Sequence, residues 1–357
     1  MNTDITEALR AQIQGQARVC ARGGGSKTAL ACMDGEVAQV STAGLSGLLE
    51  YEPDEFTFTA LAGTPIAEIE RILAEQDQYL PFDPVLVKSG ATLGGTVAAG
   101  LSGAGRYRYG GVRDFILGVQ FIDSQGELVR SGGKVVKNAA GFDLPKFMVG
   151  SLGCYGVLVE LTFKVLPRPE VSATLLARYS SLVNGLEALI RLTRQPLELY
   201  ALDLDRDARL LVRAGGAAET IASRLERLHL LLGGVEIETI EGEAEAKVWR
   251  ERREFAWLPA GCSLVKVPLT PKKVTALDNG LGNSGVNVIY SAGANLAWVG
   301  WPGETGGLDK LLSQLGLSGL KVLGSPGRAR LGEQAGETFE RRIKQALDPV
   351  GRFTCAG

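Results

Sequence analysis

The sequence predicts an α+β protein built from two lobes, and three observations lead to this prediction. The chain has 357 residues, which is more than one ordinary small core organises, so two lobes are expected. Its first half contains glycine-rich segments that run into short strands. Its second half repeats the order strand–helix–strand–strand–helix–strand, which is typical of a ferredoxin-like antiparallel sheet.

The composition is that of a globular protein and argues against several functions. Hydrophobic residues make up 45% of the chain and charged residues 22%, which suits a packed core with a polar surface. The formal net charge is −2 without a basic stripe, so nucleic acid is not an expected partner. The polar, acidic first residues do not suit a secretory signal, and no apolar run approaches the roughly 18 residues of a membrane span. Any membrane contact is therefore expected to come through a partner.

The cysteines predict a reduced, cytosolic protein. They are scattered, odd in number and never spaced as Cys-x-x-Cys. This pattern argues against a disulfide framework, a zinc site and an iron–sulfur cluster. The five are Cys20, Cys32, Cys154, Cys262 and Cys355.

The first elements surround a glycine loop. Apolar residues on one face predict a helix over 3–15, and a strand over 17–22 leads directly into the loop 23–26. Successive N–H groups of such a loop converge on an anion, but the spacing fits neither a P-loop nor a Gly-x-Gly-x-x-Gly motif. A phosphate-binding loop and a flexible turn therefore both stay open. Further strands are predicted at 37–41, 48–53 and 56–60.

A small-residue segment follows the next helix. The helix is predicted from Pro65 to about residue 76, with Thr64 as its N-cap. Glycine and other small residues then fill 89–103, where a bare backbone can approach a flat or phosphorylated ligand. A short helix at 95–100 would offer its N-terminus to a phosphate.

A second glycine-rich turn, at 150–156, precedes the last strand of the lobe. We interpret this turn and the segment 89–103 as the two walls of one cofactor slot. The remaining elements are predicted as a polar loop (106–114), a strand pair (115–122 and 128–131), an irregular segment (134–143), a short helix (144–148) and a strand (157–165).

Five motifs in a fixed order identify a family. They are Arg22-Gly-Gly-Gly-Ser-Lys27, Gly90-Ala-Thr-Leu-Gly-Gly-Thr96, Tyr109-Gly-Gly-Val-Arg-Asp114, Lys137-Asn-Ala-Ala-Gly-Phe-Asp143 and Gly150-Ser-Leu-Gly-Cys-Tyr-Gly-Val157. Their arrangement resembles the FAD-binding domain of the vanillyl-alcohol oxidase and p-cresol methylhydroxylase (PCMH) superfamily. Within it, the likeness is greatest to the E subunits of bacterial glycolate oxidases. The resemblance implies a PCMH-type FAD-binding lobe of two α+β subdomains over residues 1–170.

The resemblance also implies where FAD lies. The loop expected to hold the pyrophosphate is Gly23, Gly24, Gly25 and Ser26. The segment expected along the pyrophosphate, ribityl chain and ring is Pro84, Gly90, Thr92, Gly94, Gly95 and Thr96, continued by Gly100, Ser102 and Gly103. The later wall, expected near the adenine or ribose, is Gly153, Gly156 and Val157. The charged residues in the motifs are interpreted as ion pairs that fix loops: Arg113, Asp114, Lys137 and Asp143.

The single histidine bears on the chemistry. His229 lies in an apolar helical stretch far from the FAD motifs, so it is interpreted as a packed or surface residue. Relatives with covalent flavin use a histidine or cysteine of the FAD lobe, and none stands in that context here, so non-covalent FAD and no metal are expected. The catalytic residues stay unknown. Candidate cations for a substrate carboxylate are Arg106, Arg108, Lys134 and Arg328, and a tyrosine base, Tyr107 or Tyr109, is conceivable.

Residues 171–325 predict a cap of two ferredoxin-like units. The first unit is predicted as strand 171–179, helix 182–193, hairpin 197–204 and 208–213, helix 217–232 and strand 235–239, and the second spans 263–323. The two units are expected to merge into one sheet with helices on one face. The charged helix 243–255 between them is either solvent-facing or a lid or partner surface. The segment 326–357, with a helix at 337–347, is expected to return to the FAD lobe.

The resemblance implies an FAD-dependent oxidoreductase acting on CH–OH groups. The first hypothesis is the FAD-binding subunit of a glycolate oxidase, which takes part in oxidation of glycolate to glyoxylate and relays electrons to partners. Its implied partners are a D-type flavoprotein, an F-type iron–sulfur subunit and a small 2-hydroxy acid. The implied location is cytoplasmic, with peripheral membrane contact through the complex. Two alternatives stay open: a self-sufficient FAD oxidase or dehydrogenase of another alcohol or hydroxy acid, and a structural subunit without bound flavin.

Overall fold

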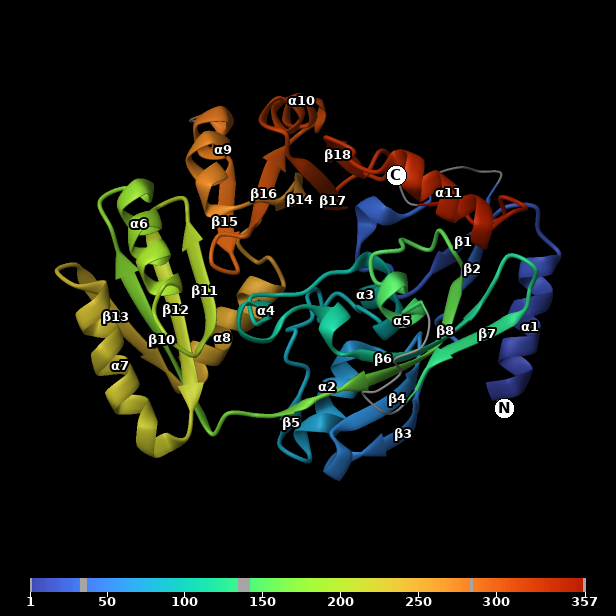
Figure 1. Cartoon of the computed structure of the whole chain (residues 1–357), viewed down its shortest axis with the longest axis horizontal. Helices are drawn as coiled ribbons and strands as arrows, with labels where there is room; N and C mark the ends of the chain where they lie inside the picture. Colours follow the sequence, from blue (N-terminus) through green and yellow to red (C-terminus); the bar gives the residue numbers. More distant parts are fainter. Residues whose placement is uncertain (1, 33–36, 134–141, 283–284, 356–357) are drawn as a thin grey trace.

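The computed structural model describes residues 2–32, 37–133, 142–282 and 285–355 (Figure 1). Two antiparallel sheets form its framework, one of five strands near the N-terminal half and one of nine strands in the second half. The predicted α+β class is confirmed. The expectations for Lys134 and Lys137 lie outside the described residues.

The first lobe is built on the five-stranded sheet, in the order β3-β4-β8-β6-β7. The interior strand β4 is buried along its whole length, since Phe58 and Ala60 belong to the main core of the lobe and Leu61 belongs to a second core with residues of the N-terminal helix and of the strand that follows it. The strands are β3 (Leu48–Glu52), β4 (Thr57–Leu61), β6 (Ile116–Ile122), β7 (Leu128–Gly132) and β8 (Val157–Lys164). The helices are α2 (Ile66–Ala74), α3 (Leu93–Ala99), α4 (Arg106–Tyr109) and α5 (Leu144–Met148), with a short pair of strands, β5 (Gln78–Tyr79) and β9 (Leu166–Pro167).

A small parallel sheet lies beside this framework. It pairs β1 (Val19–Arg22) with β2 (Ala38–Ser41), and α1 (Asn2–Gln14) precedes it. The pairing of Arg22 with Ser41 ends the sheet at the start of the glycine loop. The loop therefore leaves the carboxyl end of a parallel strand.

The cap is one sheet in the order β13-β10-β12-β11-β15-β16-β14-β17-β18. Each half has the strand neighbours of a ferredoxin-like unit, and β11 joins β15 through the pairing of Leu204 with Tyr290. The expected merger into one sheet is therefore seen. The first half consists of β10 (Val171–Arg178), α6 (Leu182–Thr193), β11 (Leu199–Asp205), β12 (Arg209–Gly216), α7 (Ala218–Leu232) and β13 (Glu236–Glu241). The second consists of β14 (Cys262–Pro268), α9 (Val274–Leu281), β15 (Asn287–Ser291), β16 (Leu296–Pro302), α10 (Gly306–Leu315), β17 (Ser318–Leu323) and β18 (Arg330–Gly332).

The two lobes share a core. One face of the cap sheet packs on its helices, whereas Leu264, Trp298 and Val322 on the other face join the core of the first lobe. The cap is thus held against the first lobe by apolar burial.

Helix α8 (Gly242–Arg253) has an exposed face, but its other face is anchored inside the protein. Trp249 is buried, and its indole N–H donates to Thr174 Oγ1 at 2.9 Å. At the end of the helix, Arg253 donates to both carboxylate oxygens of Glu70 on α2, at 2.7 and 3.0 Å. The helix therefore lies between the cap sheet and α2 of the first lobe and contacts both (Figure 1).

The C-terminal segment packs beside β1, close to the N-terminal helix α1. After α11 (Glu337–Leu347), Phe353 is buried beside β1. Val19 N–H donates to the carbonyl of Arg352 at 2.7 Å, and Thr354 N–H donates to the carbonyl of Val19 at 2.9 Å. Within the part of the chain that the structure describes, no helix is long and apolar enough to cross a membrane.

Two local predictions differ from the structure. Pro65, not Thr64, occupies the N-cap of α2, because the buried Thr64 hydroxyl donates to the Leu61 carbonyl at 2.7 Å. The polar loop 106–114 contains α4 and a short 3₁₀ turn.

Candidate cofactor site

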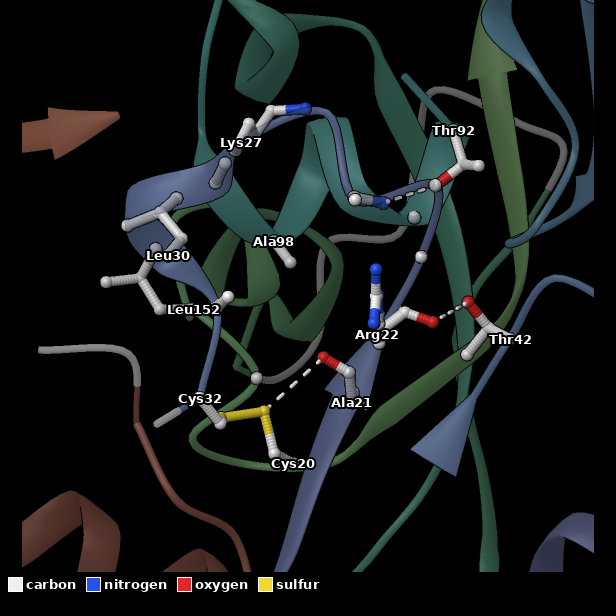
Figure 2. A pocket seen from close by; sticks show the side chains of 18 of the residues that line it. Cys20, Ala21, Arg22, Lys27, Leu30, Cys32, Thr42, Thr92, Ala98 and Leu152 are labelled. Atoms are coloured by element: carbon white, nitrogen blue, oxygen red, sulfur yellow. Dashed lines mark hydrogen bonds between the residues drawn. A yellow bond between two sulfur atoms is a disulfide. The ribbon is translucent and has the colours of Figure 1, made fainter. Parts of the chain in front are cut away.

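A cavity of about 330 Å³ lies between the glycine loop 23–26, helix α3 and the turn 150–156 (Figure 2). The sequence predicts that two segments form the two walls of one slot: the segment 89–103, which contains α3, and the turn 150–156. The structure brings them together with the loop, so all three glycine-rich segments meet at one cavity.

The loop is held by β1 and by the segment before α3. Thr42 donates to the Arg22 carbonyl from both its N–H, at 2.9 Å, and its hydroxyl, at 3.3 Å. Gly24 packs so closely that an added Cβ would overlap the carbonyl of Gly90. Gly25 has a φ of +71°, which favours glycine. The loop thus needs glycine for its own packing and turn.

Helix α3 starts at the cavity. The Thr92 hydroxyl caps it by accepting from Gly95 N–H at 3.3 Å. A Cβ on Gly94 would lie 2.8 Å from the Cβ of Ala62 on the segment after β4, which is too close. The absence of a side chain at Gly94 therefore lets α3 pack closely against the segment after β4, and this packing explains why glycine is needed there.

The turn 150–156 makes the opposite wall. Gly153 has a φ of +77°, and a Cβ on Gly156 would lie 2.6 Å from the Phe121 ring. The hydroxyl of Ser151 is buried at the cavity without a hydrogen-bond partner. An unpartnered buried hydroxyl is costly, so it suits a ligand with polar atoms at this wall.

The predicted FAD residues divide into two groups. Those that line the cavity are Gly23, Gly24, Gly25, Ser26, Thr92, Gly94, Gly95, Gly153 and Gly156. Those that do not line it are Pro84, Gly90, Thr96, Gly100, Ser102, Gly103 and Val157. Several of the second group have packing roles: Gly103 contacts Asp83, the Ser102 hydroxyl accepts from Val112 N–H at 3.0 Å, and Val157 is fully buried in the core.

Sequence reasoning assigned no role in the site to several charged and polar lining residues. Arg22, Gln39 and Thr42 reach the cavity because β1 and β2 pair in parallel, which local sequence does not reveal. Lys27 also lines the cavity, and its Nζ donates to the Ser26 hydroxyl at 3.2 Å. Burial lowers the pKa of Lys27 to about 8.

The electrostatics of the cavity favour an anion. Outside the disulfide, the ionisable side chains among its described lining residues are Arg22 and Lys27, both cationic. Loop N–H groups, these two cations and the free Ser151 hydroxyl fit the pyrophosphate and hydroxyl groups of a dinucleotide.

The candidate base and cation residues lie elsewhere. Tyr109 lines a second cleft of about 720 Å³ between α2, α8 and the cap sheet. The Arg108 guanidinium lies 4.7 Å from the Tyr200 ring, and Tyr107 packs against the cap core near Gly293. Arg328 pairs with Asp309 at 3.1 Å.

Lys266 is a buried amine at the lobe junction that sequence reasoning did not find. It projects from β14 and donates to the carbonyl of Gly100, the residue that ends α3, at 3.0 Å. Burial, with the positive charge of Arg106, lowers the pKa of Lys266 to about 8. His229 lies on α7, with its ring 3.3 Å from the Thr239 hydroxyl.

The two acidic motif residues hold local structure through different contacts, and only Asp143 does so through an ion pair. Asp114 accepts from Gly111 N–H at 2.8 Å, and Asp143 caps α5 and pairs with Lys146 at 2.9 Å. The positive charge of Arg113 also acts on Asp143.

The expectation of five reduced thiols is wrong for four of them. Cys20 is bonded to Cys32, and Cys154 is bonded to Cys355, while Cys262 is free. Sequence spacing could not show the Cys154–Cys355 pair, because these two positions, 201 residues apart, meet only through the return of the C-terminal segment.

Comparison with known proteins agrees with this geometry. Residues 2–132 match the family model of an FAD binding domain. The chain is 35% identical over 312 residues to glycolate oxidase subunit GlcE of Escherichia coli (strain K12), covering 86% of this chain and 83% of that protein. It is 28% identical over 234 residues to glycolate oxidase subunit GlcD of Bacillus subtilis (strain 168), covering 59% of this chain and half of that protein. A solved structure of alkyldihydroxyacetonephosphate synthase superposes with a TM-score of 0.71 at 15% identity, over 97% of this chain and 74% of that one, which shows a shared fold.

Proposed function

Because the chain belongs to the family of the glycolate oxidase subunit GlcE and contains an FAD binding domain, we propose that it is the FAD-binding subunit of a glycolate oxidase complex. In this proposal it takes part in oxidation of glycolate to glyoxylate and passes electrons to partner subunits. The observation that carries the proposal is the cavity bounded by three glycine-rich segments and lined by two cations.

The chain's own residues would hold the cofactor as follows. The N–H groups of loop 23–26 would bind the pyrophosphate, and Arg22 and Lys27 would offset its charge. Ser151 would donate to a polar group at the opposite wall. The chemistry that FAD contributes when it is bound is to accept a hydride from a carbon that carries a hydroxyl group. We propose that it is held without a covalent bond, since Cys20, Cys32 and Cys154 of this lobe are paired in disulfides.

The chemistry of the lining supports a relay role. A 2-hydroxy acid needs a base for its hydroxyl proton and a cation for its carboxylate. Among the described residues that line the cavity there is no carboxylate or histidine, and Tyr109 and Arg108 lie by the second cleft. We therefore propose that glycolate is oxidised mainly on a D-type flavoprotein subunit, and that this chain carries electrons onward beside an F-type iron–sulfur subunit. We also propose that the complex is located in the cytoplasm and contacts the membrane peripherally through these partners.

The test is anaerobic flavin reduction. The FAD-loaded chain is mixed with glycolate alone and, separately, with glycolate and the D-type subunit, and the flavin absorbance is followed. We expect a slow response from the chain alone and a fast one in the mixture. Full-rate bleaching of the isolated chain would show a self-sufficient dehydrogenase instead.

A variant links the cavity to this result. In Gly24→Ala, the new Cβ would overlap the Gly90 carbonyl, so we expect loss of FAD and of electron relay. Gly306→Ala is the matched control, because a Cβ there meets nothing within 4 Å. If wild-type protein took up no FAD at all, the chain would be a structural subunit.

A further inference from the structure

Two of the five cysteines, Cys20 and Cys32, line the cofactor cavity, and two more, Cys154 and Cys355, form a second disulfide beside it. They come from three distant parts of the chain, near residues 20–32, 154 and 355. The disulfide Cys20–Cys32 has both its cysteines in the cavity lining (Figure 2). Its sequence separation is 12, so it closes a short ring of chain around the phosphate-binding loop.

The second disulfide fixes the opposite wall. Cys154 lies in the turn 150–156, and Cys355 lies in the C-terminal segment beside β1. The two disulfides are neighbours, since Cys32 Sγ lies 3.8 Å from the hydroxyl of Thr354. One disulfide therefore links the two ends of the segment that contains loop 23–26, and the other links the turn 150–156 to the C-terminal segment. The two disulfides are connected through the contact of Cys32 with Thr354, the residue before Cys355.

Each disulfide has one buried and one accessible partner. Cys20 is 8% exposed and Cys154 is 2% exposed, whereas Cys32 is half-buried and Cys355 is exposed. Cys32 and Cys355 are the less buried residues of the two pairs, so we expect a thiol reagent to attack there, with the inner sulfur as the leaving group.

We propose that these disulfides make the retention of FAD depend on the thiol redox state. A dithiol reductant attacks Cys32 Sγ, the S–S bond breaks, and Cys20 leaves as a thiolate that takes up a proton. The second thiol of the reductant then attacks the mixed disulfide and releases Cys32. In sum, one disulfide and one dithiol give two cysteine thiols and one oxidised reductant. This inference rests on FAD binding and not on the proposed reaction.

The Cys20–Cys32 bond is expected to matter more than the other. The C-terminal segment keeps further ties after reduction, because Lys344 Nζ donates to the carbonyls of Cys154 and Phe353, both at 2.6 Å. The chain from the loop to Cys32 has fewer such ties, among them Thr28 Oγ1 to the Gly324 carbonyl at 3.0 Å. Reduction of this bond removes the covalent tie around loop 23–26, which is then held only by noncovalent contacts such as the Thr42 hydrogen bonds to the Arg22 carbonyl.

The experiment measures FAD dissociation from the full chain, before and after treatment with dithiothreitol, by trapping released FAD with a competing flavin-binding apoprotein. Reduction is expected to speed dissociation by about tenfold or more, as the closed ring is opened. Thiol titration of the denatured chain should rise from Cys262 alone to all five cysteines. Unchanged dissociation after all five thiols appear would overturn the inference, as would five thiols in the air-oxidised protein.

Variants separate the two bonds. The double variant Cys20→Ser, Cys32→Ser should release FAD fast with or without dithiothreitol, and Cys154→Ser, Cys355→Ser should show a smaller change. Cys262→Ser is the matched control and should behave as wild type. If the first variant instead retained FAD as tightly as the oxidised wild type, with its circular dichroism unchanged, the inference would be wrong.

Discussion

At the scale of the residue, Lys27 couples the cofactor cavity to pH. Its amine lines the cavity, and burial lowers its pKa to about 8. A bound pyrophosphate would favour the charged amine and raise this pKa. Binding would then take up a proton between the two pKa values, so the affinity for FAD should be highest below pH 8 and fall as pH rises through about 8.

The measurement is the Kd of FAD for the apoprotein over the pH range on either side of 8. Wild type should lose up to about tenfold in affinity per pH unit within the window. Lys27→Met should bind more weakly below pH 8 and lose most of the slope, whereas Lys88→Met, which changes an exposed lysine, should keep it. Equal slopes in all three proteins would remove Lys27 from the coupling.

Residue-scale sequence reasoning found the backbone of the site better than its side chains. The glycines of loop 23–26 and α3 are recognisable because tight turns and close packing need glycine locally. Arg22 stood in the first motif and was given no role, whereas Gln39 escaped notice because the parallel pairing of β1 with β2, a long-range contact, brings it to the cavity. Lys266 escaped for the same reason, since its partner Gly100 is on the other lobe.

At the scale of the element, α8 sets how the lobes meet. Its Arg252 donates to Asp203 at 3.3 Å, and Asp203 also accepts from the Ser291 hydroxyl at 2.6 Å. Burial raises the pKa of Asp203, and the positive charge of Arg252 opposes this rise. The carboxylate therefore depends on α8 for its countercharge.

Arg252→Met should destabilise the protein through this carboxylate. Removing one partner of a buried ion pair costs about 3–5 kcal/mol in the free energy of unfolding. The loss should shrink as pH falls, because the Asp203 carboxyl, whose pKa is already raised, takes up a proton and no longer needs a countercharge. Denaturant unfolding at mildly acidic and mildly basic pH tests both statements.

Lys247→Met on the same helix is the control. Its side chain is 67% exposed, so its effect should stay within about 0.5 kcal/mol at either pH. A pH-independent loss in Arg252→Met would mean that packing, and not the unpaired carboxylate, explains the change.

The elements themselves were largely predictable, and their placement was not. Period-2 and helical patterns gave the repeated strand–helix order of the cap, and the sheet order follows it closely. The charged pattern of α8 suggested an exposed helix, yet Trp249 and Arg253 anchor it between the lobes. The composition of a helix shows that it carries charged side chains, but the residues that pair with those charges are known only from the tertiary structure.

At the scale of the molecule, the two ends of the chain complete the cofactor lobe. Phe353 packs with Leu9 and Ile13 of α1 and with Val19 of β1, and β1 leads into loop 23–26. The guanidinium of Arg352 also donates to the Gln14 carbonyl at 3.0 Å. The loop's geometry is therefore supported by residues more than 300 positions away along the chain.

This dependence predicts that Phe353→Ala weakens both the fold and the cofactor site. Phe353 is 2% exposed, and truncation of a buried phenylalanine costs about 3–5 kcal/mol in the free energy of unfolding. Because β1 would lose its packing partner, the affinity for FAD should fall as well. Phe339→Ala, in α11, is the matched control: its ring is 67% exposed, so unfolding should change by less than about 0.5 kcal/mol. Denaturant unfolding and FAD titration of both variants give the comparison. A Phe353→Ala protein that is destabilised but binds FAD with wild-type affinity would show that the C-terminal segment stabilises the lobe without shaping its loop.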